Sequence, residues 1–582
     1  MTRTLRPLRL KNISTLTHEG AQAYDYSQKH PLIHLTFTMG SALFTDGHYH
    51  RQEQEVHRFA QALLAAYKAE PLFPWQYGAW VRDPFEGKGN RIQGTLTPAI
   101  LDGLLDETSH TQRYVELCLK HRVDDVLSFY RHYETLGLGG PSRSARYGMA
   151  NALTHFDEYQ LMKYAAAKSD LRLCDVIYIL KEELQALGDK AQLVLDVGRY
   201  LHAPGRKREA LSKPLPLTTA RKTLFRQTKS AVYRADFFQQ VKAARPTWEQ
   251  LIGQFGISMK DLKGDERTHA LLVNAMLWQV MLSIPRLLPD LALLRNIGNI
   301  YEADISREII ETSIKRRSFR KLWPHQIYAA YQHAPQARPG LELLFQTITN
   351  KLPEGRHLGI GDASGSMTVR VGGIKSKISA MDVAFCLVGL MSESSGLGAS
   401  FSDNSWFGYT QKKYLHIAKR SASQSALAFS FDRRIRFGMG GTQVFGAVIE
   451  LIVWLKTHPE VQPPDCLWFF SDMQFHPAEG ATDAIPPELH ARARQYGLGQ
   501  NAPPLELALR LYREQFGRVD VVLWNLAAYA PVPVPADIEG VLLVSGFDAN
   551  TLDLVKRWRD GKLDEQPLEQ GQEVILEHIR SY

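Results

Sequence analysis

The hydrophobic pattern of this 582-residue chain changes its period near residue 352, and this change constrains the fold more than any other feature. Before it, apolar residues recur at three- and four-residue steps, as in "VHRFAQALLAAYKA" and "RTHALLVNAMLWQVMLSIP". That spacing is typical of amphipathic helices, and Gly and Pro separate one such stretch from the next. Many helices in series predict a helical-repeat array, although no strict repeat motif can be read.

After residue 352, short apolar runs alternate with amphipathic stretches: "HLGIGDAS" precedes "ISAMDVAFCLVGLMSES", and "TQVFGAVIELIVWLKTH" precedes "DCLWFFSDMQF". Such alternation predicts a doubly wound α/β domain with a mainly parallel sheet, in which ligands bind at the carboxyl ends of the strands. The chain is also too long for one hydrophobic core. We therefore expect two domains, residues 1–352 and 353–582.

Five oxygen-bearing side chains stand where this second domain is expected to bind a ligand. Asp362, Ser364 and Ser366 follow the first predicted strand at alternate positions, Thr442 follows a glycine turn, and Asp472 follows a buried strand. Carboxylate and hydroxyl oxygens are the ligands that Mg²⁺ or another hard divalent cation prefers. Without His or Cys in the set, zinc is disfavoured.

Two alternatives apply to the same stretch. Ser364 as a catalytic nucleophile would need an elbow such as G-x-S-x-G and a nearby base, and "DASGS" lacks the first glycine. A turn that caps a helix is the other alternative. The motif alone would leave the turn and the metal site nearly equal, and Thr442 and Asp472 favour the metal site. We expect a binding protein with no catalytic residues.

The charge is distributed unevenly along the chain. Residues 1–350 contain 46 Lys and Arg against 35 Asp and Glu, whereas residues 351–582 contain 23 against 26. Residues 199–245 alone contain 12 basic and two acidic residues. This asymmetry indicates a polyanionic partner for the helical part; a solvated basic surface is the alternative.

The sequence also bears on the compartment. Its four cysteines are scattered without metal-ligand spacing, the basic N-terminus lacks the apolar core of a signal peptide, and the apolar stretches are too short to span a bilayer. We expect a soluble cytoplasmic protein with no membrane partner.

The set Asp362, Ser364, Ser366, Thr442 and Asp472 resembles the metal-ion-dependent adhesion site (MIDAS) of von Willebrand factor A domains. The three residues of "DASGS" match its first motif, Thr442 its threonine and Asp472 its second aspartate. The helical half resembles the TROVE module of the Ro ribonucleoprotein family, including bacterial members. The matching stretches are "PSRSARYGMANAL" at 141–153, "YQLMKYAAAKSDLRLCDVI" at 159–177 and "LLRNIGNI" at 293–300.

This resemblance implies an all-α ring of HEAT-like helical hairpins followed by an α/β A domain, formed by a single chain. Members of that family bind small noncoding Y RNAs and the single-stranded ends of misfolded RNAs, and bacterial relatives tether an exoribonuclease through a Y-like RNA. The expected function is therefore RNA binding in RNA quality control or as a scaffold for a nuclease. The alternative is an adaptor that uses its metal site to grip an acidic residue of a protein partner, without RNA.

The candidate RNA contacts are basic residues on or near predicted helices. Arg143 and Arg146 lie three residues apart, which places them on one helix face, and Tyr147 stands where the family pattern leads us to expect another basic residue. Basic groups neutralise phosphates, and tyrosines stack on unpaired bases. The remaining candidates are Lys163, Lys168, Arg172, Arg206, Lys207 and Arg208. A disordered, solvated loop is an equal alternative for the basic run from Arg206 to Lys229.

Overall fold

The computed structural model divides the chain into two compact units. One, here the α/β unit, comprises Met1–Pro74, Trp323–Ala329 and Phe345–Tyr582; the other, here the helical unit, comprises Trp75–Leu322 and Ala330–Leu344. The expected order of a helical part followed by an α/β part is confirmed. The structure describes residues 15–43, 52–105, 109–164, 170–303, 305–317, 319, 322–371, 377–403, 413–436, 440–529, 531–561 and 568–582.

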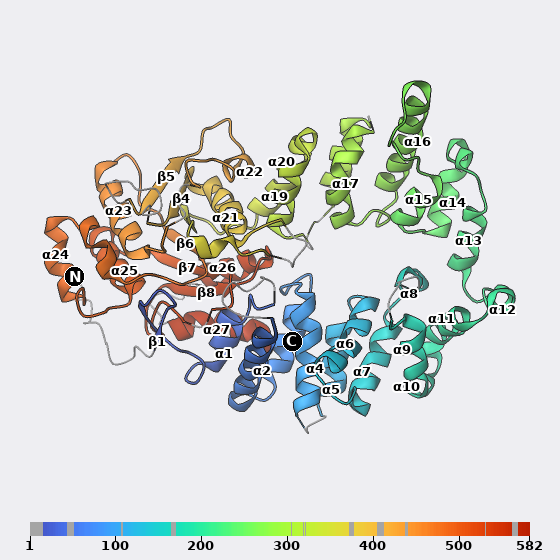
Figure 1. The fold of residues 1–582 in the computed structure, drawn as a ribbon, viewed down its shortest axis with the longest axis horizontal. Coiled ribbons are helices and arrows are strands. Elements are labelled where there is room, and N and C mark those ends of the chain that lie inside the picture. Colours follow the sequence, from blue (N-terminus) through green and yellow to red (C-terminus); the bar gives the residue numbers. More distant parts are fainter. Residues whose placement is uncertain are drawn as a thin grey trace. The chain divides into compact units, whose positions relative to one another are not determined.

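The helical unit is a series of helices that follow one another in chain order (Figure 1). Contacts are local: α4 contacts α5 and α6, α9 contacts α11, and α13 contacts α14, as expected of a repeat array. The bounds are α4 Arg91–Leu104, α5 Thr111–Leu119, α6 Val123–Thr135, α7 Arg143–Thr154, α8 Glu158–Tyr164, α9 Leu173–Ile179, α10 Lys181–Ala186, α11 Gln192–His202, α12 Gly205–Ala210, α13 Pro216–Phe225, α14 Phe237–Ala244, α15 Trp248–Phe255, α16 Gly264–Ser283, α17 Asp290–Glu302 and α18 Arg307–Lys315.

Local sequence sets where these helices begin. Ser142 caps α7 by accepting the backbone N–H of Ala145 at 3.1 Å. Thr247 and Gln250 form a capping box at the start of α15. Such caps satisfy backbone donors that a helix leaves unpaired, and each stabilises a helix by about 1 kcal/mol. Three further helices, α3 (Phe73–Arg82), α19 (Pro324–His333) and α20 (Arg338–Thr349), contribute residues to both units.

A buried ion pair joins the first helices of this unit. The carboxylate of Asp125, which is fully buried on α6, accepts hydrogen bonds from Arg82 at 2.8 Å and from Arg91 at 2.6 Å. The side chain of Arg82 is only 3% exposed. Removing one partner of a buried pair leaves a desolvated charge without compensation, which is far more costly than losing a surface pair.

Asp125→Ala is therefore expected to destabilise the helical unit by about 3–5 kcal/mol. Native-state hydrogen exchange of the amides of α4 and α6 would measure the loss. Asp189→Ala, which removes an exposed aspartate from the same unit, is the control and should leave exchange unchanged. Equal exchange in both variants would contradict a structural role for the pair.

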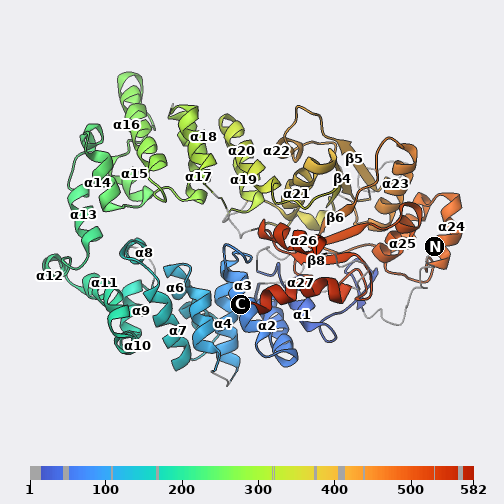
Figure 2. The same ribbon diagram turned by 180° about the vertical axis from the view of Figure 1, so that it is seen from behind.

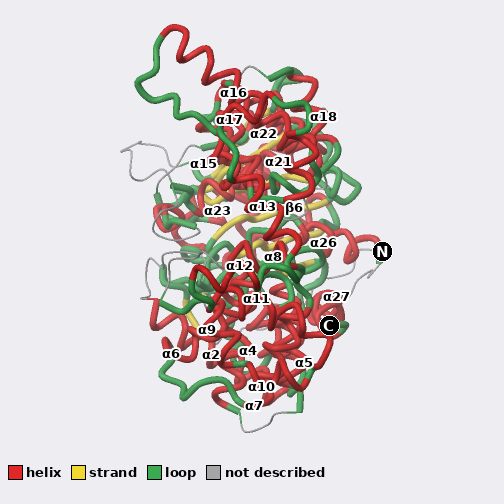
Figure 3. Tube along the Cα trace, turned by 90° about the vertical axis from the view of Figure 1, so that its right-hand side faces the viewer, coloured by secondary structure: helices red, strands yellow, loops and turns green. Residues whose placement is uncertain are grey.

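The α/β unit is built on a six-stranded sheet of order β5-β4-β3-β6-β7-β8. The strands β3, β4, β6, β7 and β8 are parallel, and β5 pairs antiparallel at one edge. Strands are yellow in Figure 3. Their bounds are β3 His357–Asp362, β4 Leu397–Phe401, β5 Leu415–Lys419, β6 Cys466–Ser471, β7 Asp520–Asn525 and β8 Val541–Ser545. The predicted, mainly parallel sheet is confirmed.

Helices pack against this sheet. Helix α21 (Ala380–Ser395) lies against β3, where Gly359 and Gly361 leave room for it: a Cβ at Gly359 would lie 2.9 Å from Cα of Val388. The core that contains Leu358 and Ile360 also holds residues of α23 (Val444–Thr457) and α25 (Pro504–Phe516). The remaining helices are α22 Ala426–Phe429, α24 Pro487–Gln495, α26 Asn550–Asp560 and α27 Leu568–Arg580.

The first described residues of the chain pack into this α/β unit and not into the helical unit. The segment 15–43 contains β1 (Thr15–Leu16), β2 (Gln22–Ala23), α1 (Pro31–Ile33) and a π-helical turn (His34–Thr38), and α2 (Gln52–Ala69) follows. Ser41 donates to the backbone carbonyl of Asn525 at 2.7 Å, and Ser545 donates to that of Thr36 at 2.7 Å. In Figures 1 and 2 the blue α1 and α2 lie beside the red α27 and β8. The division thus differs from a single boundary at residue 352, because the apolar residues of this segment complete the core of the sheet.

A buried side chain forms hydrogen bonds with the backbone at the outer edge of β8. Gln572 of α27 accepts the N–H of Leu543 at 3.2 Å and donates to its carbonyl at 3.0 Å. These two hydrogen bonds occupy backbone groups that an edge strand would otherwise offer to another chain. No helix in the described part of the chain is long and apolar enough to cross a membrane.

Candidate divalent-cation site and basic helical surface

Asp362 and Asp472 lie at the carboxyl ends of two neighbouring parallel strands. Asp362 is the last residue of β3, and Asp472 directly follows β6. The chain leaves β3 toward β4 on one side and returns to β6 on the other, so the two aspartates flank the point where the strand order reverses. Ligands of doubly wound sheets bind at this point.

Hydrogen bonds fix the two loops that carry these aspartates. The N–H of Ser364 donates to Oδ1 of Asp362 at 2.9 Å, and the hydroxyl of Ser471 donates to its Oδ2 at 2.5 Å. Ser471 Oγ also accepts the N–H of Met473 at 3.0 Å. Met473 has a φ of 63°, a left-handed conformation that costs a non-glycine residue roughly 1–2 kcal/mol. Such strain persists where the surrounding structure enforces it, often at a functional site.

The hydroxyls of the predicted set lie at the same edge of the sheet. Ser364 and Ser366 belong to the turn after β3, with their Oγ atoms 3.0 Å apart. Thr442 follows Gly441 just before α23 and is 2% exposed. Burial raises the pKa of Asp472, and a hydrogen bond from the Ser366 hydroxyl opposes this effect in part.

The electrostatics of this edge favour a cation. Asp362 and Asp472 are at most 1% exposed, and burial raises the pKa of each. The negative charge of Asp472 raises the pKa of Asp362 further. Oδ2 of Asp472 is buried and has no hydrogen-bond partner among the described residues. A buried carboxylate oxygen without a donor is costly, and a divalent cation would compensate it. The five residues therefore fit a hard divalent ion such as Mg²⁺.

Three residues at the rim of this site are not part of the five-residue motif: Asp403, His476 and Glu19. The N–H of Gly441 donates to Oδ1 of Asp403 at 2.6 Å, and Nε2 of His476 lies 3.4 Å from Oε2 of Glu19. A Cβ on Gly441 would lie 2.3 Å from Nε2 of His476 and 3.0 Å from Oδ2 of Asp403, so a larger residue there would displace these side chains. No short-range pattern could have indicated Glu19, because it meets His476 across more than 450 residues of chain.

Adding Mg²⁺ to metal-stripped protein is expected to raise the Tm of the α/β unit, by the equivalent of about 2–3 kcal/mol at a hundredfold excess over Kd. Asp362→Ala should abolish the shift because it removes one of the two buried carboxylates. Asp560→Ala, at an exposed aspartate of α26, is the control. A wild-type Tm that does not change with millimolar Mg²⁺ would exclude the site.

The effect of Mg²⁺ should also depend on pH. Because the pKa of Asp362 and Asp472 is raised in the folded state, the metal-free protein loses stability as pH rises above the ordinary carboxyl range near about 4. The cation replaces the proton, so the rise in Tm that it causes should be larger at pH 8 than at pH 5. Thermal denaturation at both values would measure this, and a larger shift at pH 5 would contradict it.

The candidate RNA contacts have three kinds of environment: exposed, paired with an acidic residue, or half-buried. Arg143 is exposed on α7 with its guanidinium 5.9 Å from the ring of Tyr147, whereas Arg146 is bound to the buried Glu183 at 2.7 Å. Arg172 is exposed but holds Asp175 at 2.9 Å. Lys163 is half-buried on α8 with its amine 5.6 Å from the ring of Tyr164. Lys168 and the side chain of Arg206 lie outside the described residues.

The basic run after residue 204 is helical in the structure and is not a loop. It forms α12, α13, a 3₁₀ turn (Lys229–Tyr233) and α14. One of its members is structural: Arg221 is 6% exposed and donates to the carbonyls of Ala244 and Arg245 at 3.0 and 2.6 Å. Eight basic side chains of the run are exposed: Lys207, Arg208, Lys213, Arg226, Lys229, Arg234, Lys242 and Arg245.

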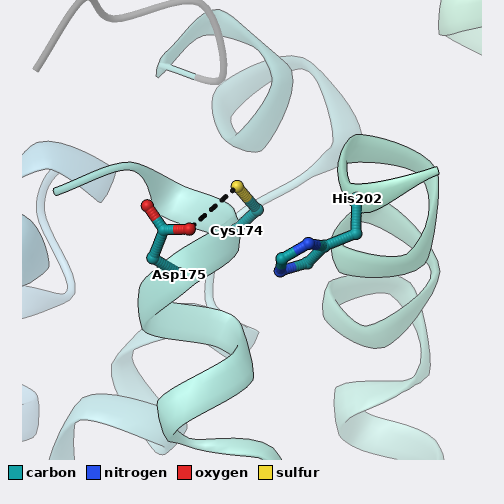
Figure 4. A group of neighbouring side chains, drawn as sticks. All are labelled: Cys174, Asp175 and His202. Carbon is teal, nitrogen blue, oxygen red and sulfur yellow. Dashed lines mark hydrogen bonds between the residues drawn. The ribbon is translucent and has the colours of Figure 1, made fainter. Parts of the chain in front are cut away.

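Cys174, Asp175 and His202 are the one group of at least three His, Cys, Asp or Glu side chains in the described part of the chain that lie close enough together to share a metal ion (Figure 4). Their donor atoms lie within 4.8 Å of one another. Hydrogen bonds from Arg172, however, occupy the carboxylate of Asp175 and lower its pKa to about 2, while burial raises the pKa of the Cys174 thiol. The carboxylate thus caps α9, which accounts for this group without a metal.

Comparison with known proteins gives a matching family model and similar solved structures, one of which is described here. A family model described as a domain of unknown function (DUF7788) matches residues 356–577. A solved structure, described as the crystal structure of the Deinococcus radiodurans RO (RSR) protein, is similar over 92% of this chain and 100% of its own, with 15% identity and a TM-score of 0.48. None of the curated proteins matches. At this identity and TM-score, the similarity does not establish membership of a family.

Proposed function

We propose that this chain is an RNA-binding protein whose helical unit binds the nucleic acid. The observation that carries the proposal is the exposed basic surface of α12 to α14, defined by the eight side chains given above. The whole helical unit contains 38 Lys and Arg against 29 Asp and Glu, whereas the α/β unit is nearly neutral. Neutralising phosphates with such side chains releases counterions and drives binding.

One exposed aromatic side chain supports RNA in particular. The rings next to the basic groups of Arg208, Lys222, Arg221 and Arg245 pack inside the helical unit, because Tyr200 is 7% exposed and Tyr159 is half-buried. On α9 the ring of Tyr178 is 69% exposed. Exposed rings bind unpaired bases by stacking, so single-stranded segments are the expected target.

The resemblance to the Ro family supports the finer proposals. These are that the RNA is a small noncoding, Y-like RNA or a misfolded RNA with a single-stranded end, that the protein has no catalytic activity of its own, and that an exoribonuclease is recruited. An adaptor that grips an acidic protein partner is the second candidate, and the site favours it less because Glu19 and Asp403 already make its rim acidic.

Lys207→Glu combined with Lys213→Glu is expected to weaken binding of a structured RNA with a single-stranded tail by about tenfold at moderate salt. Among the described residues neither amine has a hydrogen bond or ion pair, so the fold should be unaffected. Filter binding against salt concentration would also show a shallower salt dependence, since phosphate contacts are lost.

Arg494→Glu with Lys556→Glu is the matched control, because it makes the same charge change on exposed residues of the α/β unit. It should leave the affinity unchanged. No binding of the wild type at low salt, or an equal loss in the control, would overturn the proposal. Absorbance at 260 relative to 280 nm of the purified protein separates the two candidates, because co-purified RNA favours the first.

A further inference from the structure

An exposed tyrosine meets a histidine at two places beside the basic surface. Tyr178 of α9 is 69% exposed, and its ring centroid lies 5.9 Å from that of His202, the last residue of α11. Tyr233, which ends the 3₁₀ turn before α14, is 45% exposed, and its ring centroid lies 6.1 Å from that of His269 on α16. In the described part of the chain, these are the two tyrosines with exposed side chains.

The first pair is held by the packing of α9 against α11. A Cβ on Gly198 would lie 2.6 Å from Cγ2 of Ile177, so the glycine lets the two helices approach closely. His202 lies one turn after Gly198, on the same face of α11. Arg208 of α12 donates to the backbone carbonyls on either side of His202 at 3.3 and 3.2 Å. A cation of the basic surface therefore adjoins the residue that contacts the ring of Tyr178.

The second pair is held by a polar contact. The hydroxyl oxygen of Tyr233 lies 3.2 Å from Nδ1 of His269. Leu272, three residues further on the same face of α16, is 54% exposed. The exposed Lys229 begins the 3₁₀ turn that Tyr233 ends, and the exposed Arg234 follows it. An exposed ring and cations are thus combined here as well.

The chain between the two pairs is strongly basic. Residues 203–232 contain eight Lys and Arg and one acidic residue, Glu209. Helices α12 and α13, which these residues form, lie between α11 and α16 (Figures 1 and 2). A single-stranded nucleic acid suits this combination, because its phosphates need cations and its unpaired bases stack on rings. An apolar protein surface suits it less, because its binding would desolvate the cations.

We propose that Tyr178 and Tyr233 are two stacking sites for unpaired bases, and that one single-stranded segment of RNA crosses α12 and α13 between them. The exposed cations of these helices neutralise the phosphates of the crossing nucleotides, and the two histidines hold the rings in place. This inference rests on the proposed function and adds the path of the strand. A strand bound at one ring has a raised local concentration at the other, so affinity depends on strand length.

The test is the binding of oligouridylates of increasing length to the full chain, measured by fluorescence anisotropy at low salt. In the wild type the affinity should rise in a step of at least about tenfold once the strand reaches both rings, since the second contact is then intramolecular. Tyr178→Ala and Tyr233→Ala should each remove this step, because stacking on one ring contributes about tenfold. Both should keep the wild-type salt dependence, since no phosphate contact is lost.

Matched variants make the result specific. Tyr178→Phe and Tyr233→Phe keep the rings and should keep the step. Phe85→Ala removes a 48% exposed ring of the same unit outside the basic run, and should bind as the wild type does. Because all three rings are exposed, the Tm should stay unchanged throughout.

A step that persists in either tyrosine-to-alanine variant, or a wild-type affinity that rises smoothly with length, would overturn the inference. The proposed function would then stand, because it depends on filter binding of structured RNA and on Lys207 and Lys213. No binding of any RNA by the wild type would overturn both.

Discussion

The burial of two carboxylates side by side is the constraint on which the α/β unit depends. Moving a carboxylate out of water costs several kcal/mol even after the protein relaxes, and Asp362 and Asp472 are both buried on adjacent strands. The hydroxyl of Ser471, the backbone N–H of Ser364 and the left-handed turn at Met473 all serve to hold these groups. Packing alone would not require such an arrangement, since apolar residues at the same positions would need neither the strained turn nor the hydroxyls.

In the helical unit, the basic residues have different roles according to their burial. Arg146 and Arg221 are bound to a glutamate and to backbone carbonyls, so their charges stabilise the fold. Lys207 and Lys213 project from neighbouring turns of the chain into solvent. The charge excess of the sequence therefore overstates the number of cations that a polyanion can reach, and the exposed ones concentrate on α12 to α14.

The order of the two parts and the parallel sheet could be predicted because they depend on local periodicity, and the positions of Asp362 and Asp472 at strand ends could be predicted for the same reason. The cation itself stays a prediction. The burial of Arg221 within the basic run could not be predicted. Its position in the sequence suits either a solvated loop or a packed helix, and its hydrogen bond to the carbonyl of Ala244 shows that the helix is packed. The place of residues 15–43 could not be predicted either, because Ser41 contacts Asn525 across 484 residues and no local pattern indicates such a contact. Glu19 escaped prediction for the same reason. The ring implied by the Ro resemblance stays a prediction.

The pairing of the N-terminal segment with the sheet has a consequence for synthesis. The aromatic side chains of Tyr24, Tyr26 and Phe37 are buried in the core of the sheet, whose strands are synthesised hundreds of residues later. Asn525, the hydrogen-bond partner of Ser41, is synthesised 484 residues later, which takes roughly half a minute to a minute and a half at typical elongation rates. During that interval the helical unit is able to fold, because its contacts are local. Residues 15–43 are not, because the sheet on which they pack has not yet been made. Closing the α/β unit is thus a late event that brings residues 15–43 together with β7 and β8.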